Sequence, residues 1–185
     1  MTKVFIGGSR KLTKLPSLVT ERLANIMQNG FQVLVGDANG ADKAVQAYFA
    51  FQDYRQVAVF HTDKICRNNL GNWKTTSILA PAGKLTFKAY TLKDEAMAQA
   101  ANYGFMLWDA KSKGTLNNLI NLLKEDKKAL VYLSAAPAIY RLHNFADLKA
   151  LLTKCNQLDL EKFSHELPLA KFGLATSYNE TLFAT

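Results

Sequence analysis

Short apolar segments alternate with amphipathic segments along the first 133 residues of the chain. Apolar runs of strand length occupy residues 3–6, 31–35, 56–60, 104–108 and 129–133. Apolar positions at the three- and four-residue spacing of a helix occupy residues 16–29, 41–51, 92–101 and 115–125. Strands that are apolar throughout are typical of a parallel sheet covered on both faces. The pattern therefore predicts an α/β, Rossmann-like domain with a mainly parallel sheet and helices on both faces.

Two parts of the chain depart from this regular alternation. Between residues 61 and 92 the periodicity is lost, and only residues 84–89 resemble a short strand. Lys93 and Asp94 follow, and we interpret them as the first turn of the next helix. Beyond residue 133 we expect one strand and one helix. We therefore assign residues 1–133 to the Rossmann-like domain, and residues 134–185 to a C-terminal extension that packs on the domain or on a second subunit.

The composition of the chain indicates an ordinary globular protein. Hydrophobic residues make up 49% of the chain and charged residues 21%, as in ordinary globular domains. The apolar runs are too short to span a bilayer, so we expect no membrane partner. Two cysteines form no disulfide framework, and the start of the chain has no signal-peptide pattern, so we expect a cytoplasmic protein. The net charge of +8 favours anionic partners, nucleic acid among them.

The first candidate motif is the segment Gly7-Gly8-Ser9-Arg10, which directly follows the first strand. Glycine permits a sharp turn that brings backbone amides close to an anion, and Ser9 adds a hydroxyl. Arg10 offers two parallel donors to a phosphate or a carboxylate. The alternative interpretation is a tight turn followed by a solvated arginine.

The second motif spans residues 36–42, between a strand and a helix. Gly36 and Gly40 permit close approach of a ligand, and a helix N-terminus attracts negative charge. Asp37, Asn39 and Asp42 are candidate partners for a sugar or a base. Asp42 is also compatible with a helix cap, which is the commoner role of such a residue. The spacing differs from the dinucleotide pattern G-x-G-x-x-G, so we expect no nicotinamide cofactor and assign no other cofactor.

The third motif joins the strand at residues 104–108 to the next helix. Gly114 and Thr115 open that helix, where backbone amides can receive a phosphate. Trp108 ends the strand, Lys113 adds positive charge, and Asp109 is the carboxylate best placed for catalysis. The alternative is a capped helix start with solvated lysines.

Loops that follow parallel strands gather along one edge of the sheet, so the three motifs are predicted to meet there. Arg67 and Asn68, in the irregular region, are expected to reach the same edge. The histidines and cysteines show no ligand-like spacing, so we predict no metal site.

The three motifs in this order resemble the SLOG superfamily, named for its Smf and lonely-guy branches, the former of which includes DNA-processing protein A. The resemblance covers about residues 3–133. It implies a Rossmann-like fold that binds nucleotides, nucleotide-derived signals or, in the DNA-processing branch, single-stranded DNA.

The lonely-guy enzymes are phosphoribohydrolases and carry the motif Pro-Gly-Gly-x-Gly-Thr-x-x-Glu. Aligning its Gly-Thr on Gly114-Thr115 places the glutamate at Asn118, and part of residues 109–113 replaces Pro-Gly-Gly. Asn118 cannot accept a proton as a carboxylate does, which puts the standard route of glycosidic cleavage in question. Asp109 and Asp37 are the candidate substitutes.

Three functions follow from the motifs and the resemblance. The first is a sensor or binding protein for a nucleotide or nucleotide-derived small molecule, acting as a homodimer. The second is an enzyme that cleaves the N-glycosidic bond of nucleoside monophosphates. The third is a protein that binds single-stranded DNA, stacking its bases on Phe60, Trp73 and Trp108.

Overall fold

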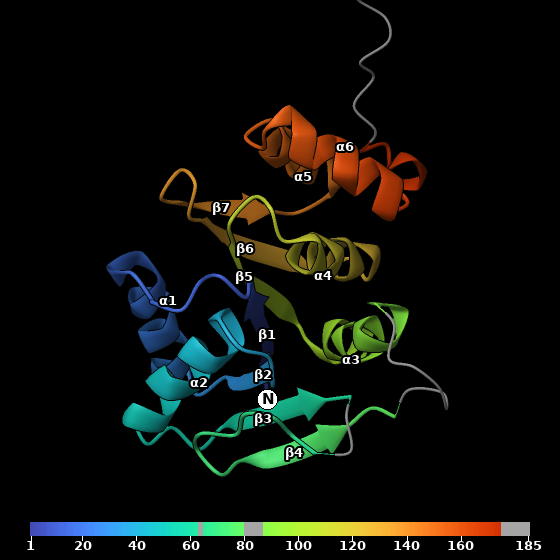
Figure 1. The fold of residues 1–185 in the computed structure, drawn as a ribbon. Helices are drawn as coiled ribbons and strands as arrows, with labels where there is room; N and C mark the ends of the chain where they lie inside the picture. Colours follow the sequence, from blue (N-terminus) through green and yellow to red (C-terminus); the bar gives the residue numbers. More distant parts are fainter. Residues whose placement is uncertain (63–64, 80–86, 175–185) are drawn as a thin grey trace, which may run out of the picture.

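The computed structural model describes residues 1–62, 65–79 and 87–174, and from residue 87 to 90 only the backbone. Its centre is one sheet of seven strands in the order β4-β3-β2-β1-β5-β6-β7 (Figure 1). All neighbouring strands are parallel except β6 and β7, which are antiparallel. The strands are β1 (Lys3–Gly8), β2 (Gln32–Gly36), β3 (Val57–His61), β4 (Lys74–Ser77), β5 (Tyr103–Trp108), β6 (Lys128–Leu133) and β7 (Ala138–Leu142).

Helices cover both faces of the sheet, as the sequence predicts. The helices α1 (Ser17–Gln28) and α2 (Ala41–Phe51) lie on one face, and α3 (Phe87–Ala100) and α4 (Lys113–Lys124) lie on the other (Figure 1). Each face has its own apolar core. None of the helices in the described part of the chain is long and apolar enough to cross a membrane. The predicted Rossmann-like α/β fold is confirmed.

The order of the strands creates a switch point next to β1. From β1 the chain adds β2, β3 and β4 to one side of the sheet, and then returns to place β5 and β6 on the other side. The loops after β1 and β5 therefore leave the sheet toward opposite faces. A crevice opens between such loops, which is the usual ligand position in open α/β sheets.

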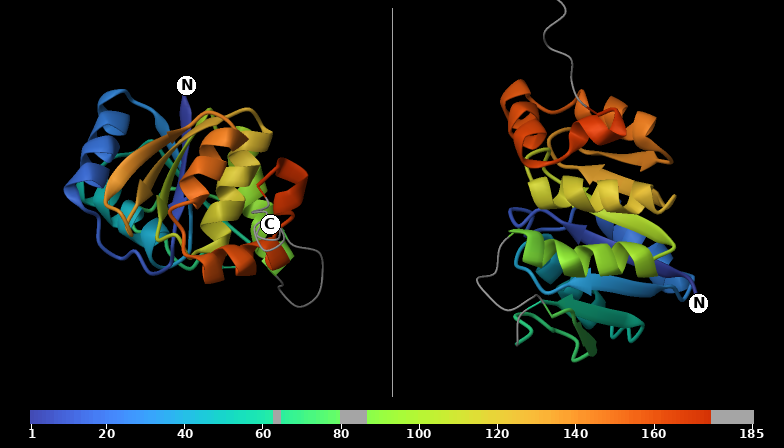
Figure 2. Two further views of the ribbon diagram at one scale, coloured as in Figure 1. Left: turned by 90° about the horizontal axis from the view of Figure 1, so that it is seen from above. Right: turned by 90° about the vertical axis from the view of Figure 1, so that its right-hand side faces the viewer.

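Residues 134–174 extend the sheet and its core. Strand β7 pairs with β6, and α5 (Phe145–Leu152), α6 (Gln157–Glu166) and a 3-10 turn (Leu169–Phe172) follow it. Helix α5 contacts α4, and the rings of Phe163 and Trp108 lie 6.2 Å apart between centroids. Figure 2 shows these helices stacked beside α4, at the β7 end of the sheet.

Two sequence interpretations are wrong in the irregular region. The strand expected over residues 84–89 is not formed by residues 87–89, because α3 already begins at Phe87; residues 84–86 lie outside the described part. Lys93 and Asp94 therefore belong to the second turn of α3, not to its start. The strand β4 was missed, because its sequence Lys-Thr-Thr-Ser is polar and mostly exposed at the edge of the sheet.

Candidate functional site

A cleft of about 460 Å³ opens at the carboxyl ends of β1 and β5, where the switch point lies. Its walls come from the loops after β1, β2 and β5 and from α2, α3 and α4. Of the residues predicted from the sequence, those that line it are Gly7, Gly8, Ser9, Arg10, Asp42, Arg67, Asp109, Gly114, Thr115 and Asn118. The structure thus brings the three motifs together in one cavity.

The loops after β1 and β5 are tied together across the cleft. The Ser9 hydroxyl donates to Asp109 Oδ2 at 2.7 Å, and the Ser9 amide donates to the Leu107 carbonyl at 2.9 Å. Asp109 Oδ1 accepts from the amides of Lys111 (3.0 Å) and Ser112 (2.8 Å). Both carboxylate oxygens of Asp109 are therefore occupied in shaping the loops.

This arrangement bears on the catalytic role predicted for Asp109. A carboxylate that already accepts three hydrogen bonds has few lone pairs left for a substrate. The geometry favours a positioning role, in which Asp109 fixes Ser9 and the start of α4.

The second loop is anchored by an ion pair between the buried Asp37 and the partly exposed Arg67. Asp37 is fully buried and accepts from Arg67 Nε (2.9 Å), Nη2 (2.6 Å) and its amide (3.1 Å). Burial alone would raise the pKa of Asp37, but the hydrogen bonds and charge of Arg67 outweigh it and lower the pKa. Asn68 adds bonds to the Asp37 carbonyl (2.7 Å) and to Asn39 Oδ1 (3.1 Å). Asp37 thus fixes the segment that carries Arg67 to the cleft.

Two glycines serve contacts between loops. Gly40 has a φ of 82°, and a Cβ there would overlap the backbone of Arg10. A Cβ at Gly8 would overlap the Leu107 carbonyl oxygen and approach Ala41. Glycine at these positions lets the first loop pack closely on α2 and β5. Of the two, only Gly8 lines the cleft.

The floor of the cleft holds a cluster of polar side chains that are mostly buried. The sequence interpretation named two of them, Asp42 and Asn118, and missed Lys93 and Asp94. Lys93 is 6% exposed and forms a 2.5 Å ion pair with Asp94. In the amide orientation that satisfies both acceptors, Asn118 donates to Asp94 Oδ2 (3.2 Å) and to the Gly114 carbonyl (3.1 Å). Asp42, also 6% exposed, completes the cluster and accepts from the Ala38 amide at 3.3 Å. We call Asp42, Lys93, Asp94 and Asn118 the floor cluster.

Burial and neighbouring charges shift the pKa values of the ionisable residues in the floor cluster. Burial is the main reason that the pKa of Asp42 rises to about 6, and the charge of Asp94 adds to the effect while Lys93 opposes it. Burial likewise raises the pKa of Asp94, against the attraction of Lys93. Burial acts to lower the pKa of Lys93, but Asp94 and Asp42 overcome it and raise the pKa. Strongly shifted groups in a cleft are typical of functional sites.

The floor cluster lies directly over the ends of β1 and β2. A Cβ on Gly36 would overlap Asp42 Oδ2 and stand 3.1 Å from Lys93 Nζ. A Cβ on Gly7 would lie 3.7 Å from Asp42 Oδ1 and 3.6 Å from the Asn118 amide. The glycine at the end of β2 therefore makes room for the cluster. Gly36 itself does not line the cleft, and acts through Asp42.

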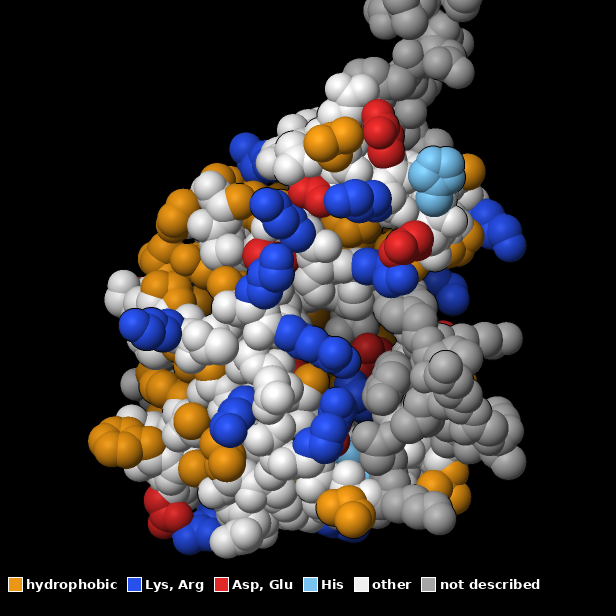
Figure 3. Space-filling model, in the orientation of Figure 1, with side chains coloured by type: hydrophobic (Ala, Val, Ile, Leu, Met, Phe, Trp, Pro, Cys, Tyr) orange, Lys and Arg blue, Asp and Glu red, His pale blue; other side chains and the backbone are white. Residues whose placement is uncertain are grey.

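The mouth of the cleft is basic. Arg10, Lys11 and Lys111 are exposed around it. The N-terminus of α4 opens on the same space through Gly114 and Thr115, with Ser112 as its cap. Figure 3 shows lysine and arginine side chains gathered across the middle of the face it draws. A basic rim and a helix N-terminus together suit an anionic group.

The remaining predicted residues have other surroundings. Lys113 pairs with Glu166 on α6 at 2.6 Å. Trp108 is fully buried and donates from its indole nitrogen to the Ser112 carbonyl at 3.0 Å. Phe60 and Trp73 are 8% and 7% exposed and belong to the core. The proposal that these three rings stack on DNA bases is therefore wrong.

Comparison with known proteins supports the fold. No protein-family model and no curated protein sequence matches the chain. A solved structure of DNA processing protein A from Helicobacter pylori, described for its single-stranded DNA binding mode, matches with a TM-score of 0.57. The match covers 92% of this chain and 81% of that one, at 13% sequence identity. The chain therefore shares the Rossmann-like fold of DNA processing protein A.

Proposed function

We propose that the protein binds a nucleotide or a nucleotide-derived ligand in the switch-point cleft. The observation that carries this is one cavity with a basic mouth, a helix N-terminus and buried carboxylates on its floor. A phosphate is the natural occupant of the mouth, and sugar hydroxyls are natural donors to carboxylates on the floor. A nucleoside phosphate offers both kinds of group at opposite ends.

The phosphate end is assigned to the start of α4. Ser112 caps the helix by accepting from the Thr115 amide at 3.3 Å, which orients the first turn at the edge of the cleft. The partial positive charge of the helix N-terminus favours an anion there. Arg10 and Lys111, from loops tied together through Ser9 and Asp109, supply side-chain charge next to it.

The sugar end is assigned to Asp42. Its carboxylate lines the cleft, yet within the described residues it accepts only the 3.3 Å bond from the Ala38 amide. A buried carboxylate with so few donors is costly unless a ligand supplies one. A ribose hydroxyl is a donor of the right kind.

Calorimetry with nucleoside 5′-monophosphates tests the proposal. We expect saturable binding by the wild type. Arg10→Gln removes a charge-assisted hydrogen bond, so affinity should fall by about tenfold or more. Lys14→Gln is the matched control, because Lys14 is also exposed and loses one charge but lies outside the cleft. Equal affinity for the two variants, or no binding of any monophosphate, would reject the assignment.

We also infer kinship with the SLOG superfamily, supported by the fold shared with DNA processing protein A and by the convergence of the three motifs. The homodimer and the cytoplasmic location stay predictions from the sequence. Single-stranded DNA remains the weaker partner hypothesis. The shared fold and the basic mouth favour it, but the rings it relied on are buried.

A second candidate function is cleavage of the N-glycosidic bond, and Asp94 favours it. The resemblance places the catalytic glutamate of the lonely-guy enzymes at Asn118. Asp94 approaches the Asn118 amide at 3.2 Å from the neighbouring helix. Asp94 therefore supplies a carboxylate next to Asn118, the residue that stands where the lonely-guy enzymes have their glutamate. Asp94 accepts two hydrogen bonds, from the side chains of Lys93 and Asn118, whereas Asp109 accepts three that shape the loops. Asp94 is therefore the better candidate.

In this reaction the bond between the base nitrogen and the sugar carbon C1′ breaks, and its electron pair leaves with the base. The ionised Asp94 would stabilise positive charge at C1′ and accept a proton from the attacking water. Asp42, in its protonated form, would donate a proton to the base. The products are free base and ribose 5-phosphate, and solvent exchange restores both carboxyl groups.

Chromatographic detection of free base from nucleoside 5′-monophosphates tests this candidate. If Asp94 acts as described, Asp94→Asn should lower turnover by at least about 100-fold, as for other general acid–base groups. Glu95→Gln is the matched control, since Glu95 is exposed and next in sequence. Absence of turnover in the wild type would reject catalysis while leaving the binding proposal to calorimetry.

A further inference from the structure

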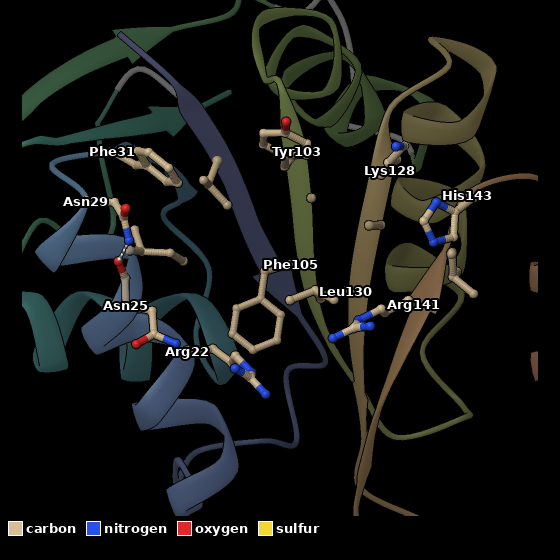
Figure 4. Close-up of a pocket in the computed structure, with 15 residues that line it drawn as sticks. Arg22, Asn25, Asn29, Phe31, Tyr103, Phe105, Lys128, Leu130, Arg141 and His143 are labelled. Atoms are coloured by element: carbon tan, nitrogen blue, oxygen red, sulfur yellow. Dashed lines mark hydrogen bonds between the residues drawn. The ribbon is translucent and has the colours of Figure 1, made fainter.

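A second cavity lies at the opposite end of the sheet from the switch-point cleft. It is a groove of about 390 Å³ between α1 on one side and β7 on the other, with β1, β5 and β6 as its floor (Figure 4). None of the described helices covers this part of the sheet on the α1 side (Figure 2). We call it the α1–β7 groove.

The floor and one wall of this groove are apolar. Figure 4 shows Leu130 on β6 and Phe105 on β5 along the floor, with Phe31 at one end. Leu130 and Phe31 are half-buried, whereas Phe105 is 1% exposed and forms the base beneath them. Ile26 of α1 and Val4 of β1 add aliphatic surface. Concave apolar surfaces of this size are typical of small-molecule sites.

The rim of the groove is positively charged. Arg22 comes from α1 and Arg141 from β7, and Figure 4 shows the two guanidinium groups pointing toward one another across the floor. Lys128 and His143 stand along the β6–β7 side. None of the described residues that line the groove is acidic. Neither arginine forms an ion pair with another described residue.

Two facing arginines without a carboxylate repel each other, and an anion between them removes that repulsion. The apolar floor next to them requires an apolar body on the same ligand. We propose that the α1–β7 groove binds a small amphipathic anion, with its apolar body on the floor around the half-buried Leu130 and its anionic head between Arg22 and Arg141. An aromatic or aliphatic carboxylate, sulfonate or phosphate monoester has this chemistry. The site is independent of the switch-point cleft.

Two other occupants fit the observations less well. A second copy docked on the groove about a two-fold axis would bring the same basic rims together, with no acidic residue among the described lining to compensate. A membrane surface is flat, whereas the floor is recessed between α1 and β7 (Figure 4). A free small molecule reaches the floor and satisfies the arginines together.

A matched pair of fluorescent probes tests the proposal on the full chain. The anionic probe is 8-anilinonaphthalene-1-sulfonate, and the neutral probe is N-phenyl-1-naphthylamine, which has the same ring system without the sulfonate. We expect the sulfonate to bind the wild type at least about tenfold more tightly than the neutral probe, because hydrogen bonds to charged groups contribute strongly.

Variants separate the head group from the floor. Arg22→Gln/Arg141→Gln should reduce affinity for the sulfonate to that for the neutral probe, and leave the neutral probe unchanged. Leu130→Glu should weaken both probes, because it places a carboxylate on the floor. The control Lys14→Gln/Lys149→Gln removes two exposed charges elsewhere and should change neither. Circular dichroism of each variant shows whether the fold is retained.

Three results would overturn the proposal. The first is equal affinity for the two probes in the wild type. The second is unchanged sulfonate binding in the double arginine variant with its fold intact. The third is a dimer, by light scattering, that dissociates when the sulfonate is added, which would identify the groove as a subunit interface. Binding that survives in Arg10→Gln would separate this site from the switch-point cleft.

Discussion

Replacing Asp42 by asparagine should make the protein more stable at neutral pH. Burial raises the pKa of Asp42 to about 6 in the folded protein, from an ordinary value of 3.8. The difference is about two pH units, and each unit corresponds to about 1.4 kcal/mol, so ionised Asp42 destabilises the folded state by roughly 3 kcal/mol. Asparagine has a similar shape, can still accept from the Ala38 amide and carries no charge.

The pH dependence has a definite sign. Below about pH 3.8 the carboxyl group is protonated in both the folded and the unfolded protein, so it contributes nothing to the difference. Between about pH 3.8 and 6 the unfolded chain ionises while the folded protein keeps the proton, and the wild type loses stability as the pH rises. Above about pH 6 the loss is complete. The advantage of Asp42→Asn should therefore be small at pH 4 and reach its full value by pH 7.5.

Urea denaturation at several values between pH 4 and 8 measures this difference. The control is Asp126→Asn, because Asp126 is exposed in a turn with a φ of 53° that asparagine also adopts. Its stability relative to the wild type should be flat with pH. If the stability of Asp42→Asn relative to the wild type is also independent of pH, or if this variant is less stable at pH 7.5, burial does not destabilise the ionised Asp42. Asp42 would then need no hydrogen-bond donor from a ligand.

Three further predictions follow from the geometry of the cleft. Gly36→Ala should weaken nucleotide binding and lower the free energy of unfolding, measured in urea, by about 1–3 kcal/mol, because the added Cβ overlaps Asp42 and crowds Lys93. Unchanged affinity would contradict the position of the floor cluster. Asp109→Ala should lower the free energy of unfolding by about 1–3 kcal/mol, since three donors including the Ser9 hydroxyl lose their acceptor. An unchanged free energy of unfolding would show that these bonds do not shape the loops. Binding of single-stranded oligonucleotides should be weak, and a steep log–log dependence on salt, with a slope of several units, would instead restore the nucleic-acid hypothesis.

The strands and helices around the cleft were predictable because their patterns are local. The first strand, Val4-Phe5-Ile6, is apolar on both faces, and α4 repeats Leu116, Leu119 and Leu123 on one side. Such patterns of apolar residues are set directly by which side chains are buried, so they can be read from the sequence. Strand β4 carried no such signal. Its backbone pairs with β3 at the edge of the sheet, where side chains need not be apolar.

The meeting of the glycine loops was predictable from topology, and Asp42 and Asn118 were named as site residues, but the Lys93–Asp94 pair on the floor was not predicted. Lys93 and Asp94 are adjacent in sequence, as exposed residues of a helix often are. Only the packing of α3 against α4 buries Lys93 and most of the Asp94 side chain beside Asn118. The sequence singled out Asp109 as a candidate catalytic residue because it directly follows a strand. Its partners come from two loops, one of them 100 residues earlier in the chain, so its structural bonds were invisible in the sequence.

Amide chemical shifts during titration with the tightest-binding nucleoside monophosphate test the central claim most directly. If the nucleotide lies in the switch-point cleft, the largest shifts should occur at Gly8, Ser9, Gly114 and Thr115, around the mouth and the start of α4. The pattern should be lost with Arg10→Gln at the same ligand concentration. Shifts centred on the α1–β7 groove, or no shifts at saturating ligand, would contradict the account.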